Sequence, residues 1–125
     1  MKRIILDTNF LLIPSQFNVD VFSQIKKLMT VPYELHVLDE TVKELEKIKE
    51  EQKGKSRDAA KLGLQLIEGR VKVITTTGGH ADDIIVAVAD KDTIVATQDQ
   101  GLKRRLKEKD IQIIYLRQKK HLQLQ

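Results

Sequence analysis

Short apolar runs alternate with helical patterns along nearly the whole chain. The apolar runs are typical of buried strands, and between them apolar residues recur at the three- and four-residue spacing of helices. The runs that predict strands cover residues 3–6, 33–38, 71–74, 93–96 and 111–116; the helical patterns cover residues 19–29, 39–48, 59–67, 81–89 and 101–109. Because strands and helices alternate, we expect an α/β fold, a three-layer α/β/α sandwich with a central parallel sheet.

Two segments interrupt this pattern. Residues 49–57 are rich in charge and include Gly54, which predicts a solvated break between two helices. A basic segment follows the last predicted strand. The length of 125 residues suits a single core, so we expect one domain over residues 1–117 and a basic C-terminal tail over residues 118–125.

The composition excludes several classes of protein. The absence of Cys excludes disulfides, thiolate zinc sites and thiol catalysis, and it favours a cytoplasmic protein. We find no apolar run long enough for a membrane span and no signal peptide. The low aromatic content of 4% argues against extended base-stacking platforms.

The net charge of +4 favours a polyanionic partner, in particular a nucleic acid. Positive residues concentrate at 103–107 and 117–120. A solvated helix face and a loose tail are the structural alternatives for these two clusters.

Carboxylates follow the predicted strands at one edge of the expected sheet, where sites form in parallel sheets. Asp7 ends the first strand, Glu44 lies in the helix after the second, Asp82 opens the helix after the third, and Asp99 follows the fourth. Each acid taken singly is explained by a helix cap or a surface ion pair. Four on one edge repel one another unless a cation lies between them. Their oxygen ligands predict one or two Mg²⁺ or Mn²⁺ ions rather than zinc.

Residues beside the acids are expected to support them. At about 100° per residue, Asp82 lies at the boundary of the apolar face of its helix, whereas Asp83 points toward solvent. His80 is interpreted as a loop residue, with a metal ligand or proton shuttle as the alternative. The residues expected to surround and fix the carboxylates are Thr8, Asn9, Thr97 and, more remotely, Asp83.

Four segments of the chain resemble PIN-domain ribonucleases. They are residues 6–9, 42–45, 81–85 and 96–102, in the order and spacing of that family. The resemblance covers nearly the whole chain and is closer to archaeal PIN proteins related to ribosomal-RNA-processing nucleases than to toxins of toxin–antitoxin pairs. It implies a compact α/β/α sandwich with an acidic cluster formed by Asp7, Glu44, Asp82 and Asp99.

The resemblance also implies a function, a metal-dependent endoribonuclease that hydrolyses phosphodiester bonds in single-stranded or flexible RNA, in rRNA processing or RNA turnover. Asp7, Asp82 and Asp99 would hold one or two ions that activate water, with Glu44 bound directly or through water. Lys103 and Arg104 would contact the RNA backbone without sequence selectivity. A homodimer and an antitoxin or ribosome-assembly partner are further expectations from the resemblance.

Three other functions stay open at this point. An RNA-binding or scaffold PIN protein would use the site little or not at all, and a toxin would require a small antitoxin. A phospho-acceptor receiver domain shares a parallel sheet and clustered acids, but it needs paired acids after its first strand and a Lys after its last. Here a single Asp7 ends the first strand, and an irregular basic segment follows the last, which argues against a receiver domain.

Overall fold

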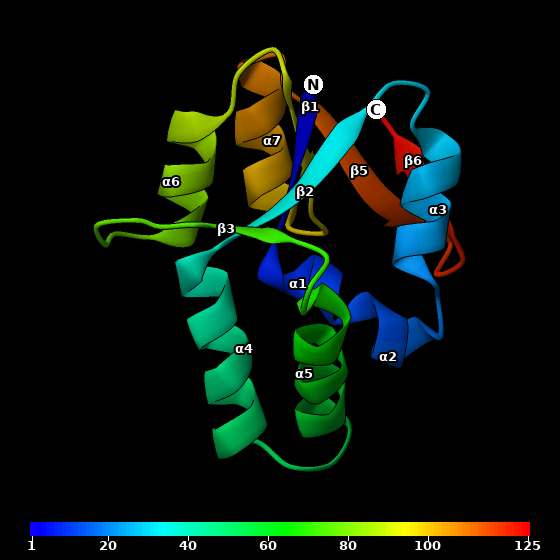
Figure 1. The fold of residues 1–125 in the computed structure, drawn as a ribbon, viewed down its shortest axis with the longest axis vertical. Coiled ribbons are helices and arrows are strands. Elements are labelled where there is room, and N and C mark those ends of the chain that lie inside the picture. Colours follow the sequence, from blue (N-terminus) through cyan, green and yellow to red (C-terminus); the bar gives the residue numbers. More distant parts are fainter.

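A six-stranded sheet with the order β3-β2-β1-β4-β5-β6 forms the centre of the computed structural model, which describes residues 1–125 (Figure 1). Strands β1 to β5 pair in parallel, and β6 pairs antiparallel with β5. The strands are β1 (Lys2–Leu6), β2 (Tyr33–Leu38), β3 (Lys72–Ile74), β4 (Thr93–Ala96), β5 (Gln112–Arg117) and β6 (His121–Leu124). The order places β1 between β2 and β4, at the middle of the sheet.

Seven helices cover both faces of the sheet. They are α1 (Thr8–Leu11), α2 (Ile13–Phe17), α3 (Val21–Leu28), α4 (Asp39–Glu51), α5 (Gly54–Ile67), α6 (Ala81–Val88) and α7 (Gln100–Glu108). None of them combines the length and the apolar character that crossing a membrane would require.

Alternate residues of the central strands belong to two separate cores. Ile4 and Leu6 pack with buried residues of α1 to α5, whereas Ile5 packs with those of α6 and α7. Successive side chains of a strand point to opposite faces, so the two cores lie on the two sides of the sheet. The predicted three-layer α/β/α sandwich is therefore confirmed.

The charge-rich segment 49–57 is more helical than predicted. Helix α4 continues to Glu51 and α5 begins at Gly54, so that only Gln52 and Lys53 separate them. Lys and Glu are good helix formers, and packing of α4 against α5 as a hairpin stabilises both helices (Figure 1). Gly63 of α5 permits close approach to α1, because a Cβ atom there would lie 2.9 Å from the Leu11 carbonyl oxygen.

The expected basic tail is ordered as part of the sheet. Residues 121–124 form β6, and Leu122 is buried in the core. A β-turn with Gln118 and Lys119 at its centre, both with positive φ, reverses the chain after β5, and the Lys120 N–H donates to the Arg117 carbonyl at 3.2 Å. Such turns usually contain Gly or Asn, and their absence here hid the hairpin in the sequence.

Candidate acidic active site

The chain reverses its winding direction between β1 and β4, the two neighbouring strands at the middle of the sheet. Helix α1 follows β1 onto one face, whereas α7 follows β4 onto the other. The backbone N–H of Asp7 donates to the carbonyl of Ala96 at 2.9 Å, which joins the two strand ends. Crevices at such points are the usual ligand sites of open parallel sheets.

Asp7 is almost completely buried at this point, with 5% of its surface exposed. One carboxylate oxygen, Oδ1, accepts a hydrogen bond from the Thr8 N–H at 2.9 Å. The other, Oδ2, accepts from the Thr97 hydroxyl at 2.8 Å and from the Asn9 amide at 3.1 Å. Burial raises the pKa of Asp7 and is the largest effect; the hydrogen bonds oppose it, and the charges of Asp82 and Asp99 raise it further.

Asn9 and Thr97 connect the first acid to the fourth. The Asn9 Oδ1 atom accepts a hydrogen bond from the Gln98 N–H at 2.9 Å. The Thr97 hydroxyl oxygen accepts one from the Asp99 N–H at 3.1 Å. Residues expected to support the carboxylates are thus in direct contact with them, and their role in activity stays a prediction.

Asp99 caps α7, since its Oδ1 atom accepts a hydrogen bond from the Leu102 N–H at 2.9 Å. Asp82 lies half-buried in the first turn of α6. Its pKa is raised by burial and then by the charge of Asp99, while Arg105 lowers it. Asp83 is exposed and forms an ion pair with Arg105 at 2.8 Å. The two neighbouring acids therefore differ in exposure, as the helical angles predict.

Glu44 approaches this group from α4. Its Oε2 atom accepts a hydrogen bond from the Thr8 hydroxyl at 3.1 Å. Glu44 also lines a groove of about 310 Å³, together with Lys43, Lys47 and His80. His80 occupies the N-cap position of α6 without a capping side-chain bond, which leaves its imidazole at the groove.

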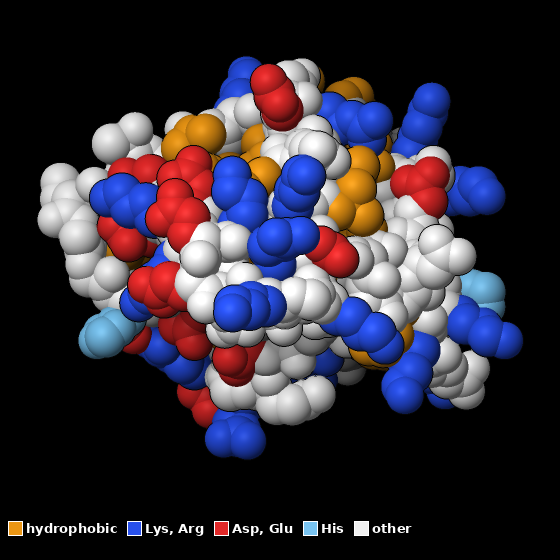
Figure 2. Space-filling view, turned by 90° about the horizontal axis from the view of Figure 1, so that it is seen from below, with side chains coloured by type: hydrophobic (Ala, Val, Ile, Leu, Met, Phe, Trp, Pro, Cys, Tyr) orange, Lys and Arg blue, Asp and Glu red, His pale blue; other side chains and the backbone are white.

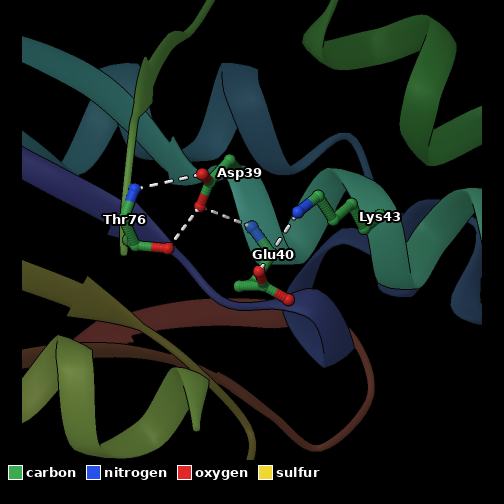
Figure 3. A network of polar contacts seen from close by, with 4 residues as sticks. All are labelled: Asp39, Glu40, Lys43 and Thr76. Atoms are coloured by element: carbon green, nitrogen blue, oxygen red, sulfur yellow. Dashed lines mark hydrogen bonds and ion pairs between the residues drawn. The ribbon is translucent and has the colours of Figure 1, made fainter. Parts of the chain in front are cut away.

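Asp39, which the sequence did not indicate as part of the site, connects two of the loops at this edge. The structure places Leu38 at the N-cap and Asp39 in the first turn of α4. Its carboxylate accepts hydrogen bonds from the Thr76 N–H at 3.0 Å, the Thr76 hydroxyl at 2.7 Å and the Glu40 N–H at 2.9 Å (Figure 3). The hydrogen bonds from Thr76 lower the pKa of Asp39. This network ties the loop before α6, which carries Asp82, to the start of the helix that carries Glu44.

Gln98 is a second residue that sequence reasoning missed. Its side-chain amide donates to the Leu116 carbonyl at 3.3 Å and accepts from the Leu116 N–H at 2.6 Å. The two bonds continue the ladder between β4 and β5 beyond its last backbone pair. Gln98 thereby holds the segment between Thr97 and Asp99 against β5.

The chemistry of the donor set suits a hard divalent cation. None of the four acids takes part in an ion pair of the structure. Burial and, after it, the repulsion among the acids raise the pKa of Asp7 and Asp82, and Arg105 opposes this at Asp82 without contacting its carboxylate. Carboxylate oxygens are the ligands that Mg²⁺ and Mn²⁺ prefer. No three acidic or imidazole side chains, however, lie close enough together to hold one ion at the same time. The acids form an open set around the crevice, in which Asp7 is the most rigidly held.

The two residues expected to contact RNA differ from each other. Arg104 is exposed on α7. Lys103 is buried, and its ammonium group lies 4.5 Å from the centroid of the Tyr115 ring. Arg104 is therefore accessible for the expected contact with the RNA backbone, whereas buried Lys103 is not freely accessible.

The chain is similar in sequence and in structure to known proteins. Residues 4–119 match the model of a family described as PIN like domain. The chain is 31% identical over 128 residues to ribonuclease VapC4 of Methanocaldococcus jannaschii, covering 99% of this chain and 97% of that protein. It is 29% identical over 119 residues to ribonuclease VapC9 of Archaeoglobus fulgidus, covering 94% and 85%. The solved structure of the PIN domain endonuclease Utp24 is similar with a TM-score of 0.79 and 26% identity, covering 98% of this chain and 90% of that one.

Proposed function

The chain belongs to the family of PIN-like domains, and from this premise we propose that it is a divalent-metal-dependent endoribonuclease that hydrolyses phosphodiester bonds in RNA. The observation that carries the proposal is the group of Asp7, Asp82 and Asp99 at the centre of the sheet edge, where their charges act on one another without a basic partner in contact. The names of the relatives, two ribonucleases and an endonuclease, support the reaction type.

In this proposal, the carboxylates of Asp7, Asp82 and Asp99 would hold one or two ions, with Glu44 bound directly or through water. Since no three of these side chains lie close enough together in the structure to share one ion, they would move together on binding it. A bound Mg²⁺ or Mn²⁺ would compensate their repulsion, activate water for attack on the phosphodiester, and offset charge on the phosphate. Asp7 would provide a fixed position, because three hydrogen bonds orient its carboxylate. Glu44 would provide an adjustable one, since it is exposed and held only by Thr8.

The residues around the acids would orient them and not react themselves. Thr97 holds both Asp7 and Asp99 through one hydroxyl group, and Thr8 holds Glu44. Removing residues that hydrogen-bond the metal ligands in this way lowers metal affinity or activity by roughly 10- to 100-fold. Asp83 would act at a distance, through its ion pair with Arg105.

The toxin of a toxin–antitoxin pair is a second candidate function, because both archaeal relatives carry the name VapC. In that case an antitoxin would be the partner, whereas a ribosome-assembly partner would accompany a role in rRNA processing. Toxicity on expression in a host, relieved by a co-expressed neighbouring gene and absent for Asp82→Asn, would favour the toxin.

The test of the proposed activity is cleavage of a labelled single-stranded RNA with Mn²⁺ or Mg²⁺, with and without chelator. Asp82→Asn should abolish metal-dependent cleavage, while Asp83→Asn, which removes the same charge one residue away, should keep most of it. Equal loss in both variants would remove the special role of Asp82. Cleavage by the wild type in excess chelator would contradict the metal-dependent mechanism.

A further inference from the structure

Basic and polar side chains lie together beside α7, on the adjoining face of the hairpin formed by β5 and β6. The Lys103 ammonium covers the Tyr115 ring, and the Tyr115 hydroxyl donates to Gln123 at 3.1 Å. Arg117 approaches the same Gln123 oxygen at 3.5 Å, and its strand partner is His121. Directly paired residues of two strands project to the same side of a sheet. We call this set the hairpin surface; it consists of Lys103, Lys107, Tyr115, Arg117, His121 and Gln123.

The segment that provides this surface carries a large excess of positive charge. Residues 100–125 contain eight Lys and Arg and only two acids, and no acid occurs from residue 111 onward. The positive charge of this segment exceeds the net +4 of the whole protein. Figure 2 shows Lys and Arg side chains around a His on the right, the side of the β5–β6 turn, whereas acidic side chains gather on the left. Such a distribution attracts a polyanion to one side of the molecule.

Lys103 is a buried cation without a counter-ion. It takes part in no ion pair, and its pKa is lowered by burial and then by the neighbouring charge of Lys107. The Tyr115 ring compensates part of this charge through a cation–π contact. An anion bound to exposed Lys107 would offset the repulsion between the two ammonium groups, so that the surface is electrostatically complementary to a phosphate group.

The hairpin surface begins next to the acidic site. The Lys103 N–H donates to the Asp99 carbonyl at 3.0 Å, which places Lys103 one helical turn after the acid that caps α7. At 1.5 Å per residue, this separation along the helix is about 6 Å. From there the surface continues across Tyr115 to Arg117 and His121, at the turn of the hairpin.

We propose that the hairpin surface binds the backbone phosphates of a single RNA strand that extends from the acidic site along β5 and β6. This inference rests on the proposed function, because that function places the reacting phosphodiester at the acids. Arg117 offers a planar guanidinium that pairs well with phosphate, and Lys107 offers an exposed ammonium group. Buried Lys103 adds positive charge beside the Tyr115 ring without being a direct contact. Contacts of this kind give affinity and orientation without selecting a sequence.

The proposal is tested by RNA binding in excess chelator, where cleavage plays no part. The variant Lys107→Gln/Arg117→Gln removes two exposed charges of the surface. The matched control Lys55→Gln/Lys61→Gln removes two exposed charges from α5. For a labelled single-stranded RNA of about 20 nucleotides, loss of two phosphate contacts should reduce the slope of log K against log salt concentration by about 1.4 and weaken binding roughly tenfold or more at low salt. The control should change neither quantity.

A second measurement separates this surface from the acidic site. With metal present, the surface variant should raise KM for the 20-nucleotide RNA. Its kcat/KM on a dinucleotide, whose single phosphodiester would occupy the acidic site, should match the wild type. If the wild type cleaves neither RNA but binding is weakened only in the surface variant, the proposed function fails while the hairpin surface stands. Equal weakening in the variant and the α5 control, or no weakening in either, would overturn the surface.

Discussion

The hydroxyl group of Thr97 donates a hydrogen bond to the carboxylate of Asp7 at 2.8 Å, although 90 residues separate the two in the chain. Thr97 is completely buried, and the same hydroxyl oxygen accepts a hydrogen bond from the backbone N–H of Asp99. One side chain thus holds both Asp7, which follows β1, and Asp99, which follows β4. This contact is possible because β1 and β4 are paired neighbours in the sheet.

The variant Thr97→Val tests this arrangement. Valine has a similar shape but leaves the Asp99 N–H without its partner and removes a donor from buried Asp7, so we expect a loss of about 1–3 kcal/mol in the free energy of unfolding. We also expect metal-dependent cleavage to fall roughly 10- to 100-fold. Urea denaturation and single-turnover cleavage measure the two effects. Thr97→Ser retains the hydroxyl group and should keep most of the stability and most of the cleavage activity. A Ser variant as impaired as the Val variant would show that the hydroxyl group does not hold the two acids.

Metal binding should stabilise the protein through the four carboxylates. Because an ion that binds only the folded state adds stability by mass action, Mn²⁺ at about 100 times its Kd should add about 2.7 kcal/mol. Thermal unfolding with and without Mn²⁺ measures this as an increase in Tm. Asp82→Asn should lose most of the increase and Asp83→Asn should keep it. An increase of the same size in all three proteins would place the ion elsewhere.

The raised pKa values of two carboxyl groups should make the metal-free protein less stable as pH rises. Asp7 and Asp82 have pKa values above the usual 3.8, so the folded protein binds their protons more tightly than the unfolded chain does. In the metal-free protein, stability is therefore lost as pH rises from 3.8 through the raised values. Asp82→Asn removes one of these titrations, and its stability relative to the wild type should increase with pH across this window.

Urea denaturation in chelator, from about pH 3.5 to about pH 7, measures that difference. Asp90→Asn is the control of opposite sign, because hydrogen bonds from Asp92 and Thr93 lower the pKa of Asp90. Its stability relative to the wild type should decrease as pH rises. A difference for Asp82→Asn that is flat, or that falls with pH, would show that Asp82 is not destabilised as the structure indicates.

Local periodicity predicted the parts of the site that depend on one helix or strand. Counting angles along α6 distinguished half-buried Asp82 from exposed Asp83. The same count along α7 places Lys103 about 80° from the centre of the Leu102–Leu106 stripe, so its burial could have been anticipated.

Contacts between distant segments could not be predicted in this way. The pairing of Gln98 with Leu116 depends on the alignment of β4 with β5, and the Asp39–Thr76 network depends on the alignment of β2 with β3. Strand β6 was missed because its turn contains no Gly or Asn. The residues of a segment are enough to predict a helix or a strand. These contacts depend instead on how neighbouring strands are aligned.

The Asp39–Thr76 network should control the order of the loop before α6. Asp39→Asn weakens three hydrogen bonds to a carboxylate, and we expect faster amide hydrogen exchange in residues 75–80, with lower metal affinity because Asp82 follows that loop. Lys43→Gln, which breaks only the neighbouring exposed pair with Glu40, is the control and should leave exchange unchanged. Unchanged exchange in Asp39→Asn would mean that the loop is held by other contacts.

Gln24 of α3 should keep the edge strand β6 from pairing with other chains. Its side-chain amide donates to the Lys120 carbonyl at 3.0 Å and its oxygen accepts from the Leu122 N–H at 2.7 Å. These bonds occupy the outward-facing N–H of Leu122 in β6 and the carbonyl of the residue just before the strand. Unpaired backbone groups at a sheet edge are a template for association. We expect Gln24→Leu to lose about 1–3 kcal/mol of stability, as two hydrogen bonds are removed.

The Gln24→Leu chain should also associate at high concentration, which sedimentation or light scattering across a dilution series would detect. Gln24→Glu is the informative comparison, because its carboxylate still accepts from the Leu122 N–H but no longer donates to Lys120. If the free N–H is what permits association, Gln24→Glu remains in the oligomeric state of the wild type while Gln24→Leu does not. Association of both variants would assign the protection to the Lys120 contact, and association of neither would mean that the turn and the adjacent lysines suffice to protect the edge.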